Sequence, residues 1–552
     1  MAGAESQKEE ELISRKAEKI KSWIGRPGNL IIILILLGSL ILRIYFLNIS
    51  SGQALWWDEA EYMATAKYWA LDVPYVLNPQ RPPLFQLLAA LLIMLGFGEY
   101  ALKVILVALP ATLLIFFTYL LGNELFSKKI GIFAAGASAV MWSYLFWGAR
   151  FQPDFLSVSF QVLSLFFFWK LFKAPERKSA ILAGAFAAFG FYFKISALLV
   201  PLSVFIFALY KDGFSFIKKK EYWISLLSFI LVLIPFMAWQ YYLFGNPLAF
   251  STSYGLEGGS SERPLGWQAL EFYHLFPKFF LSIFFLAGLL LIISRFFISF
   301  DLILKDSKRR SSPEIFSLII LLTVSIFYIF YIQGVIEDRW VFLAAPLIFI
   351  ISGLGLFWIL GVLGIKSQYI QAFIVLIILI FFIMAQVGHA GALIKGKTGS
   401  YLPVKEAALW IKGNTEKDDR IISASYTQAT AYSEREVLIF SKCPWVCPQY
   451  QESEFDKMLL EKKPKYLMLS IFEGHPRWAF EVQSYPNGQF QSLRSQYLNS
   501  SLAFSQQGQV NYADWKNSVN RSGMELKLVY PPQGLNGVFV YEIIYNENNI
   551  PQ

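Results

Sequence analysis

Long apolar runs alternate with short polar segments from residue 29 to residue 388, and the pattern then stops. Apolar runs near or above about 18 residues predict membrane-spanning helices. We therefore expect a polytopic, mainly α-helical membrane protein. About 11 spans fit the pattern, over residues 29–48, 99–122, 130–148, 155–172, 179–193, 195–210, 222–244, 275–296, 315–333, 340–362 and 368–388.

Residues 82–96 are apolar over a shorter length, which is typical of a buried or interfacial helix. If this segment does not cross, Lys218–Lys220 and the basic run at 305–310 face the side of the N-terminus. Basic loops mark the cytoplasmic side. We expect a multi-pass protein of the cell membrane with a cytoplasmic N-terminus, and a first outer loop at 49–98 that contains juxtamembrane helices.

Outside the apolar region, the composition changes at both ends. Residues 1–28 are too charged for an ordinary signal peptide and predict a cytoplasmic amphipathic helix before a transmembrane domain at 29–388. Residues 389–400 read as a linker. Residues 401–552 combine helical and strand-like patterns, which favours an extracytoplasmic soluble domain of the α/β or α+β class. Its Cys443 and Cys447 flank Pro444, and the sequence leaves their pairing open.

The charge content agrees with a membrane protein, and the distribution of charge argues against binding to nucleic acid. Charged residues make up 16% of the chain, against about a quarter in soluble proteins. The net charge of +9 resides mostly in short loops, so we expect membrane lipid and no nucleic acid as a partner. The three histidines match no metal spacing, and we find no motif for ATP-driven transport in a supporting context.

The stretch from Trp56 to Leu84 concentrates the candidate chemistry. Asp58 and Glu59 follow a tryptophan pair, and Arg81 precedes two prolines. The residues between them have helical spacing and predict a helix on the membrane surface. The two acids could simply favour the start of this helix. Their position beside Arg81 at the membrane edge favours catalysis on a lipid-linked anion.

Three further charged residues lie at the outer ends of the expected spans. Asp154 follows Pro153, Lys194 separates two apolar runs, and Arg339 begins a late span. Arg81, Lys194 and Arg339 suit phosphate binding, although snorkelling would also explain Lys194. Asp58 and Asp154 could act as base and orienter or hold a divalent cation, and their spacing leaves both open.

The motifs WWDEAEY, NPQRPPL, ARFQPDFL, FYFKISALLVP and EDRWVFLAAPL, in this order, resemble those of the GT-C membrane glycosyltransferases. They are most similar to the protein O-mannosyltransferase and lipid A aminoarabinose transferase group. The resemblance implies a polyprenyl- or dolichyl-phosphate sugar donor and inverting transfer to an unknown acceptor, whether protein, lipid or glycan. It implies that Asp58, with Glu59 and Asp154, is catalytic, and that Arg81, Lys194 and Arg339 bind the donor phosphate.

Two positions depart from that pattern. Glu61 stands where the aminoarabinose transferases carry an arginine, and Gln80 replaces an acid before the basic residue. These departures leave the sugar and any metal open. A transporter or flippase without transferase chemistry is the alternative, and it would place ionisable residues near span centres.

Overall fold

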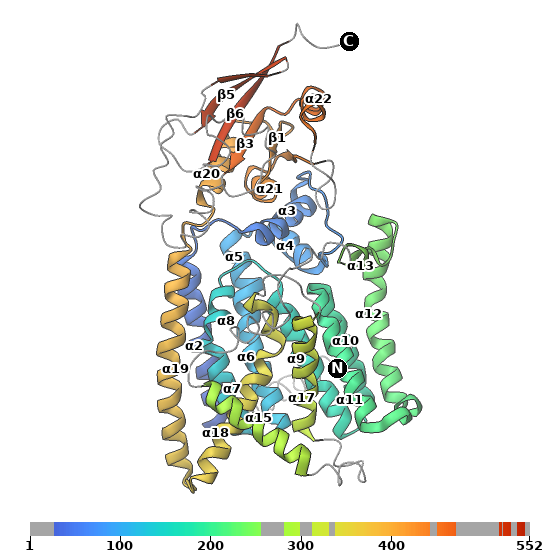
Figure 1. Cartoon of the computed structure of the whole chain (residues 1–552), viewed down its shortest axis with the longest axis vertical. Helices are drawn as coiled ribbons and strands as arrows, with labels where there is room; N and C mark the ends of the chain where they lie inside the picture. Colours follow the sequence, from blue (N-terminus) through green and yellow to red (C-terminus); the bar gives the residue numbers. More distant parts are fainter. Residues whose placement is uncertain are drawn as a thin grey trace, which may run out of the picture.

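The computed structural model describes residues 27–254, 281–298, 312–330, 337–441, 450–470, 518–521, 523–530 and 538–546. A long helical bundle carries a layer formed by α3 and α4, and a small domain containing a β-sheet lies above that layer (Figure 1). The expectations for residues 1–26 and for Cys443 and Cys447 lie outside the described residues. The expected fold class, mainly α with a C-terminal sheet domain, is confirmed.

The bundle is built from apolar helices in chain order. Among the described residues, seven helices are long and apolar enough to cross a membrane, so the protein is a multi-pass membrane protein, while the count of eleven spans stays a prediction. The helices and short helical segments of the bundle are α2 (Pro27–Ile49), α5 (Glu99–Lys103), η1 (Val104–Ala108), α6 (Leu109–Leu125), α7 (Lys128–Val140), α8 (Trp142–Trp147), α9 (Asp154–Lys173), α10 (Arg177–Phe193), η2 (Ile195–Leu198), α11 (Leu199–Asp212), η3 (Gly213–Lys218), α12 (Lys220–Phe244), α13 (Ala249–Tyr254), α15 (Leu281–Ile298), α17 (Pro313–Phe330), η4 (Asp338–Leu343), α18 (Ala345–Val362) and α19 (Gln368–Gly396).

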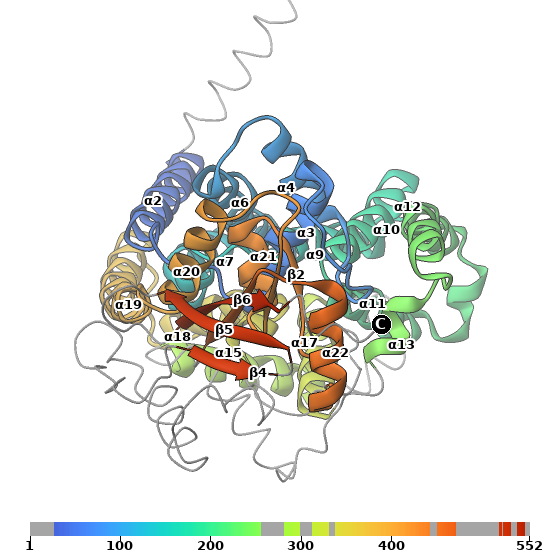
Figure 2. The ribbon, with the colours of Figure 1, turned by 90° about the horizontal axis from the view of Figure 1, so that it is seen from above.

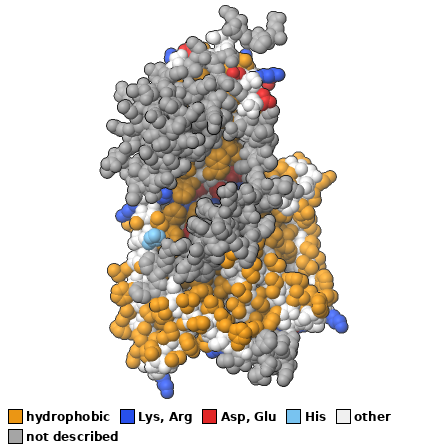
Figure 3. Space-filling view, viewed as in Figure 1, with side chains coloured by type: hydrophobic (Ala, Val, Ile, Leu, Met, Phe, Trp, Pro, Cys, Tyr) orange, Lys and Arg blue, Asp and Glu red, His pale blue; other side chains and the backbone are white. Residues whose placement is uncertain are grey.

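Exposed apolar side chains surround the bundle. Figure 3 shows them as a broad belt over the lower half of the molecule, with lysine and arginine side chains at its lower edge. Within the bundle, glycines allow close helix contacts: a Cβ on Gly355 of α18 would clash with the backbone of α15 at Phe284 and Gly288. Small residues at such contacts are typical of helix packing in membranes.

Two bundle elements differ from the hydropathy pattern. The run at 130–148 is broken at Met141, whose backbone is not helical, and the N–H of Trp142 donates to Gln386 Oε1 at 2.9 Å. Hydropathy cannot reveal this break because both halves are apolar. Helix α19 continues to Gly396, through most of the segment expected as a linker, because buried Ala390 and Ile394 pack against the bundle core.

The first outer loop contains α3 (Trp57–Leu71) and α4 (Leu84–Met94). Helix α4 has 11 residues, about 16 Å at 1.5 Å per residue, which is short for a bilayer core about 30 Å thick. Helix α3 was expected to lie on a membrane surface. Instead, α4 packs on one side of it and α21 (Tyr426–Ser433) on another, and residues 59–66 are buried.

The C-terminal domain contains a mixed sheet with the strand order β2-β1-β3-β6-β5-β4 among the described residues. The strands β1, β2 and β3 are parallel, and β6, β5 and β4 are antiparallel to their neighbours. Helices α20 and α22 pack on opposite faces of the sheet, as Figure 2 shows from above. The bounds are α20 (Leu402–Gly413), β1 (Arg420–Ser423), β2 (Glu436–Leu438), α22 (Glu452–Lys462), β3 (Tyr466–Ser470), β4 (Ser518–Arg521), β5 (Met524–Tyr530) and β6 (Val538–Tyr545).

Polar contacts fix this domain to the first outer loop. Lys67 of α3 donates to Glu434 Oε1 and to the carbonyl oxygen of Ala431, both at 2.7 Å. The backbone N–H of Leu55 donates to the Tyr432 hydroxyl, also at 2.7 Å. Helix α21 therefore holds α3 from above while the bundle supports it from below.

Candidate active site

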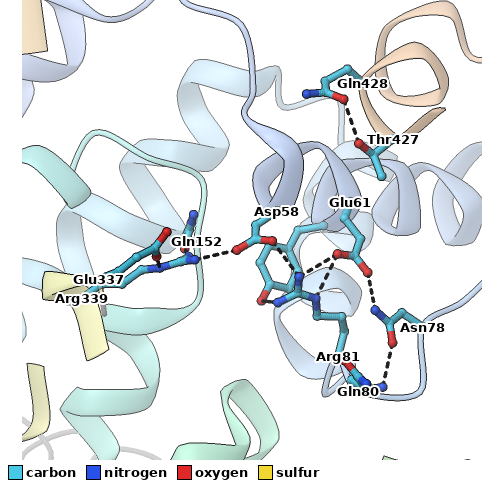
Figure 4. A network of polar contacts seen from close by, with 11 residues as sticks. Asp58, Glu61, Asn78, Gln80, Arg81, Gln152, Glu337, Arg339, Thr427 and Gln428 are labelled. Atoms are coloured by element: carbon cyan, nitrogen blue, oxygen red, sulfur yellow. Dashed lines mark hydrogen bonds and ion pairs between the residues drawn. The ribbon is translucent and has the colours of Figure 1, made fainter. Parts of the chain in front are cut away.

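Asp58 lies at the centre of a cluster of charged side chains where α3 meets the bundle (Figure 4). Its Oδ1 accepts a hydrogen bond from Arg81 Nη2 at 2.7 Å, and its Oδ2 accepts one from Arg339 Nη2 at 2.7 Å. Asp58 stands in the first turn of α3, so the start of a helix fixes one carboxylate between two guanidinium groups. The structure thus brings together three residues that span 281 positions of the chain.

Glu61 holds the other side of the Arg81 guanidinium. Arg81 Nε donates to Glu61 Oε2 at 3.0 Å, and Asn78 Nδ2 donates to Glu61 Oε1 at 2.7 Å. Glu61 is fully buried, three residues after Asp58 and hence on the same face of α3. The sequence singled out Glu61 only as a departure from the aminoarabinose transferases; its spacing from Asp58 was the signal that could have placed it in the site.

Arg339 reaches the site from η4, immediately before α18. It donates to Gln152 Oε1 and to Glu337 Oε2 as well as to Asp58. Its neighbour Asp338 accepts hydrogen bonds from Trp147 Nε1, at 2.9 Å, and from the Ser143 hydroxyl. These contacts fix η4 to α8 and so hold Arg339 in position; Gln152 and Asp338 were not among the candidates from the sequence.

Asp154 and Lys194 form a second ion pair nearby. Asp154 begins α9 after Pro153, and Lys194 ends α10 where the backbone becomes extended. Lys194 Nζ donates to Asp154 Oδ1. The buried Gln152, which contacts Arg339, lies two residues before Asp154. The same end of the bundle thus brings together five charged residues, namely Asp58, Arg81, Asp154, Lys194 and Arg339.

Glu59 lies apart from this cluster. Successive helical residues differ by about 100° in direction, and Glu59 points to Arg150, whose Nε is 3.8 Å away. The Arg150 guanidinium stacks over the Trp56 ring at 3.7 Å from its centroid. Burial raises the pKa of Glu59. The structure therefore does not bring Glu59 to Asp58, although the two are adjacent in sequence.

The charges in the cluster stabilise one another. Burial opposes the charge of Asp58, but Arg81 and Arg339 outweigh it and hold the pKa of Asp58 well below its usual value. Burial likewise opposes the charge of Arg339, but Asp154 and Asp58 outweigh it and raise the pKa of Arg339. The influence of Asp154 on Arg339 connects the second ion pair to the first. The two arginines therefore keep the buried Asp58 carboxylate ionised.

Comparisons with known proteins identify the fold that carries this cluster. Residues 80–239 match the family model described as dolichyl-phosphate-mannose-protein mannosyltransferase. The comparison with curated protein sequences gave no match. The crystal structure of ArnT from Cupriavidus metallidurans bound to undecaprenyl phosphate is similar, with a TM-score of 0.60 and 12% identity over 94% of this chain and 99% of that chain.

Two further solved structures are similar. Archaeal oligosaccharyltransferase AglB from Archaeoglobus fulgidus, in complex with an inhibitory peptide and a dolichol-phosphate, has a TM-score of 0.57 and 15% identity over 96% of this chain and 75% of that chain. Arabinofuranosyltransferase AftD from Mycobacteria has a TM-score of 0.51 and 12% identity over 94% of this chain and 40% of that chain. This chain has the fold of the GT-C membrane glycosyltransferases. The resemblance inferred from the motifs is confirmed at this level.

The acids that were expected to hold a divalent cation are paired with cationic side chains in the described residues. Another crystal structure of the Archaeoglobus oligosaccharyltransferase is a complex with Zn and sulfate. In this GT-C fold, both oxygens of Asp58 accept from arginines, and Asp154 is paired with Lys194. Among the described residues, no group of three or more His, Cys, Asp or Glu side chains is placed to hold a metal ion.

Proposed function

We propose that the protein is a glycosyltransferase that moves one sugar from a polyprenyl- or dolichyl-phosphate-linked donor to an acceptor at the outer face of the membrane. This proposal rests on one observation: Arg81 and Arg339 both form ion pairs with Asp58 at the end of the bundle. Fixed cations beside a fixed carboxylate suit a reaction that releases a phosphate and deprotonates an acceptor. The GT-C fold supports the same reaction class.

Arg81, Arg339 and Lys194 bind the donor phosphate in this proposal. Each of the three is paired with a carboxylate in the structure, so an arriving phosphate must compete for them. Guanidinium groups bind phosphate and carboxylate through the same planar pattern of donors. When the phosphate recruits the arginines, Asp58 loses its compensating charges and becomes a stronger base. Donor binding would thus activate the catalytic carboxylate.

Transfer then proceeds by one displacement. The acceptor oxygen forms a bond to the anomeric carbon of the sugar, and the bond from that carbon to the phosphate oxygen breaks. Asp58 takes the acceptor proton, and the polyprenyl phosphate leaves with the bonding electron pair. Because attack occurs opposite to the leaving group, the anomeric configuration inverts. Arg81, Arg339 and Lys194 stabilise the charge that grows on the departing phosphate.

The other acids position these groups. Glu61 and Asn78 fix the Arg81 guanidinium, and Asp154 fixes the Lys194 ammonium. Glu59 takes no part in the chemistry and stabilises the fold through Arg150. A transporter without transferase chemistry is less favoured, because this cluster lies at helix ends and not near span centres.

The test compares Asp58→Asn with Glu59→Gln, two conservative changes at adjacent positions. Release of radiolabelled sugar from a polyprenyl-phosphate sugar should fall about 10²–10⁴-fold in Asp58→Asn, as for loss of a general base. Glu59→Gln should retain transfer. Near-normal transfer by Asp58→Asn, or equal losses in both variants, would contradict the proposal.

For the orientation, we propose a cytoplasmic N-terminus and an extracytoplasmic C-terminal domain. Lysines stand in or directly beside the turns between α6 and α7, α9 and α10, and α11 and α12. These turns lie at the end of the bundle opposite that domain (Figure 1). Basic turns mark the cytoplasmic face. The active site then faces outward.

A further inference from the structure

A cavity of about 430 Å³ lies between the first outer loop and the C-terminal domain. One wall comes from the end of α3 and the following loop, with Tyr68 and residues 74–76. The other wall comes from α21, β2 with the residues after it, and α22. Pockets for small ligands typically have about 300–1,000 Å³. None of the proposed catalytic or phosphate-binding residues lines this cavity.

The side chains of the cavity suit a sugar ring. Four tyrosines line it, namely Tyr68, Tyr75, Tyr426 and Tyr450, together with Lys462 and with Glu436, which also pairs with Arg420. Most of the other lining residues are apolar. A sugar ring presents C–H groups on its faces and hydroxyl groups around its rim. Aromatic rings pack against such apolar faces, and phenol, carboxylate and ammonium groups hydrogen-bond to hydroxyls.

The cavity begins next to the active site. The Tyr426 ring contacts the Trp57 ring edge-on, with centroids 5.2 Å apart, and Trp57 directly precedes Asp58. On the cavity wall, Tyr426 stacks against Tyr75 at 6.1 Å. Burial raises the pKa of Tyr75, and the charge of Glu61 raises it further, which places Tyr75 within the electrostatic reach of the cluster. A chain of sugars could occupy both sites at once.

We propose that this cavity is a carbohydrate subsite that binds one sugar ring of a glycan next to the reaction centre. Its place beside the site rests on the proposed function, but binding itself does not require transfer. A peptide is less suited, because the described residues around the cavity offer only the three-residue edge strand β2 for backbone pairing. The glycan is the acceptor, because the proposed donor carries one sugar, and any ring attached to that sugar would be transferred with it.

The test fills the cavity with Val76→Trp, since Val76 lines the cavity and is 56% exposed. Leu409→Trp is the matched control, because Leu409 is 45% exposed on α20 and does not line the cavity. The full-length protein in phosphatidylcholine nanodiscs, which hold no sugar detergent, is examined by saturation-transfer NMR. The probes are mannotriose, maltotriose and the peptide acetyl-Ala-Ser-Thr-Ala-amide.

We expect the unmodified protein and Leu409→Trp to bind a trisaccharide, and Val76→Trp to lose that binding. Asp58→Asn should still bind it, which separates this result from failure of the proposed function. No trisaccharide binding by the unmodified protein, undiminished binding by Val76→Trp, or binding of the peptide alone would overturn the proposal. With binding established, an unchanged KM for the lipid-linked donor in Val76→Trp supports an acceptor subsite, and a higher donor KM would contradict it.

Discussion

At the scale of residues, the site depends on how two guanidinium groups are shared among acids. Arg81 bridges Asp58 and Glu61 through separate nitrogens, and Arg339 bridges Asp58 and Gln152. A planar fork of donors holds two such partners in one fixed geometry, which a single ammonium does not. The geometry therefore depends on arginine at these positions and not merely on positive charge.

Replacing Arg81 with lysine should expose this dependence. A single ammonium cannot reproduce the fork, so we expect Arg81→Lys to lower sugar transfer about 10²–10³-fold, which corresponds to about 2.7–4 kcal/mol per donor in comparable sites. Arg150→Lys is the control, since Arg150 pairs with Glu59 away from the cluster. Equal transfer rates for the two variants would remove Arg81 from the mechanism.

The depressed pKa of Asp58 predicts a particular pH dependence. A carboxyl whose pKa is lowered by folding stabilises the protein above its unfolded pKa, near 3.9, and loses that contribution only as pH falls through the lowered value. The difference in melting temperature between the unmodified protein and Asp58→Asn should therefore stay constant from about pH 7 to about pH 5. A difference that already shrinks within this window would show that the arginines do not hold Asp58 ionised.

The sequence predicted part of the site and missed part of it. A charged residue beside an apolar run is costly to place near lipid and therefore usually has a partner or a ligand. This criterion found Asp58, Arg81, Asp154, Lys194 and Arg339. Glu59 satisfied the same criterion but points elsewhere on the helix. Gln152 was invisible because a neutral side chain gives no such signal, and only the fold places it against Arg339.

At the scale of elements, the bundle relies on helices that meet at glycines. Gly355 of α18 lies directly against α15, whereas Gly361 on the same helix has open space around it. Gly355→Ala would force backbone apart, and overpacking of this kind typically costs about 1–3 kcal/mol. We expect a lower melting temperature for Gly355→Ala and no loss for Gly361→Ala. Equal stability of both variants would contradict the close contact of α15 and α18.

Sequence patterns predicted the type of most elements but not all their ends or contacts. Helix α20 and strands β1, β2, β3 and β6 lie within residues 401–552, where the sequence combines helical and strand-like patterns. Helix α21 was missed because its residues have little amphipathic pattern. All of its residues, Tyr426–Ser433, are buried, and the helix packs against α3 and α20. The same contacts bury α3, whose sequence alone suggested a helix at the lipid surface.

At the scale of the whole molecule, the proposed orientation has a direct test. In a background with Cys443 and Cys447 replaced by serine, a cysteine is placed at exposed Lys457 of α22 or at Lys366 between α18 and α19. A membrane-impermeant maleimide should label Lys457→Cys in intact cells and label Lys366→Cys only after permeabilisation. The reverse pattern would place the active site in the cytoplasm.

Hydropathy predicted the polytopic character, because an apolar run of sufficient length has few alternatives to crossing a membrane. It could not establish how the C-terminal domain sits on the bundle. That arrangement depends on individual contacts such as Lys67 with Glu434, which are 367 positions apart in the chain. The cavity beside the site exists only through this contact of domains.

The central claim is that the cations around Asp58 hold the phosphate of a lipid-linked sugar donor. The most direct measurement is the Kd of polyprenyl phosphate, determined with sugar transfer on the same preparations of the unmodified protein and Asp58→Asn. Because Asp58 competes with phosphate for Arg81 and Arg339, the account predicts tighter phosphate binding by Asp58→Asn together with loss of transfer. Weaker binding, or transfer that persists, would contradict it.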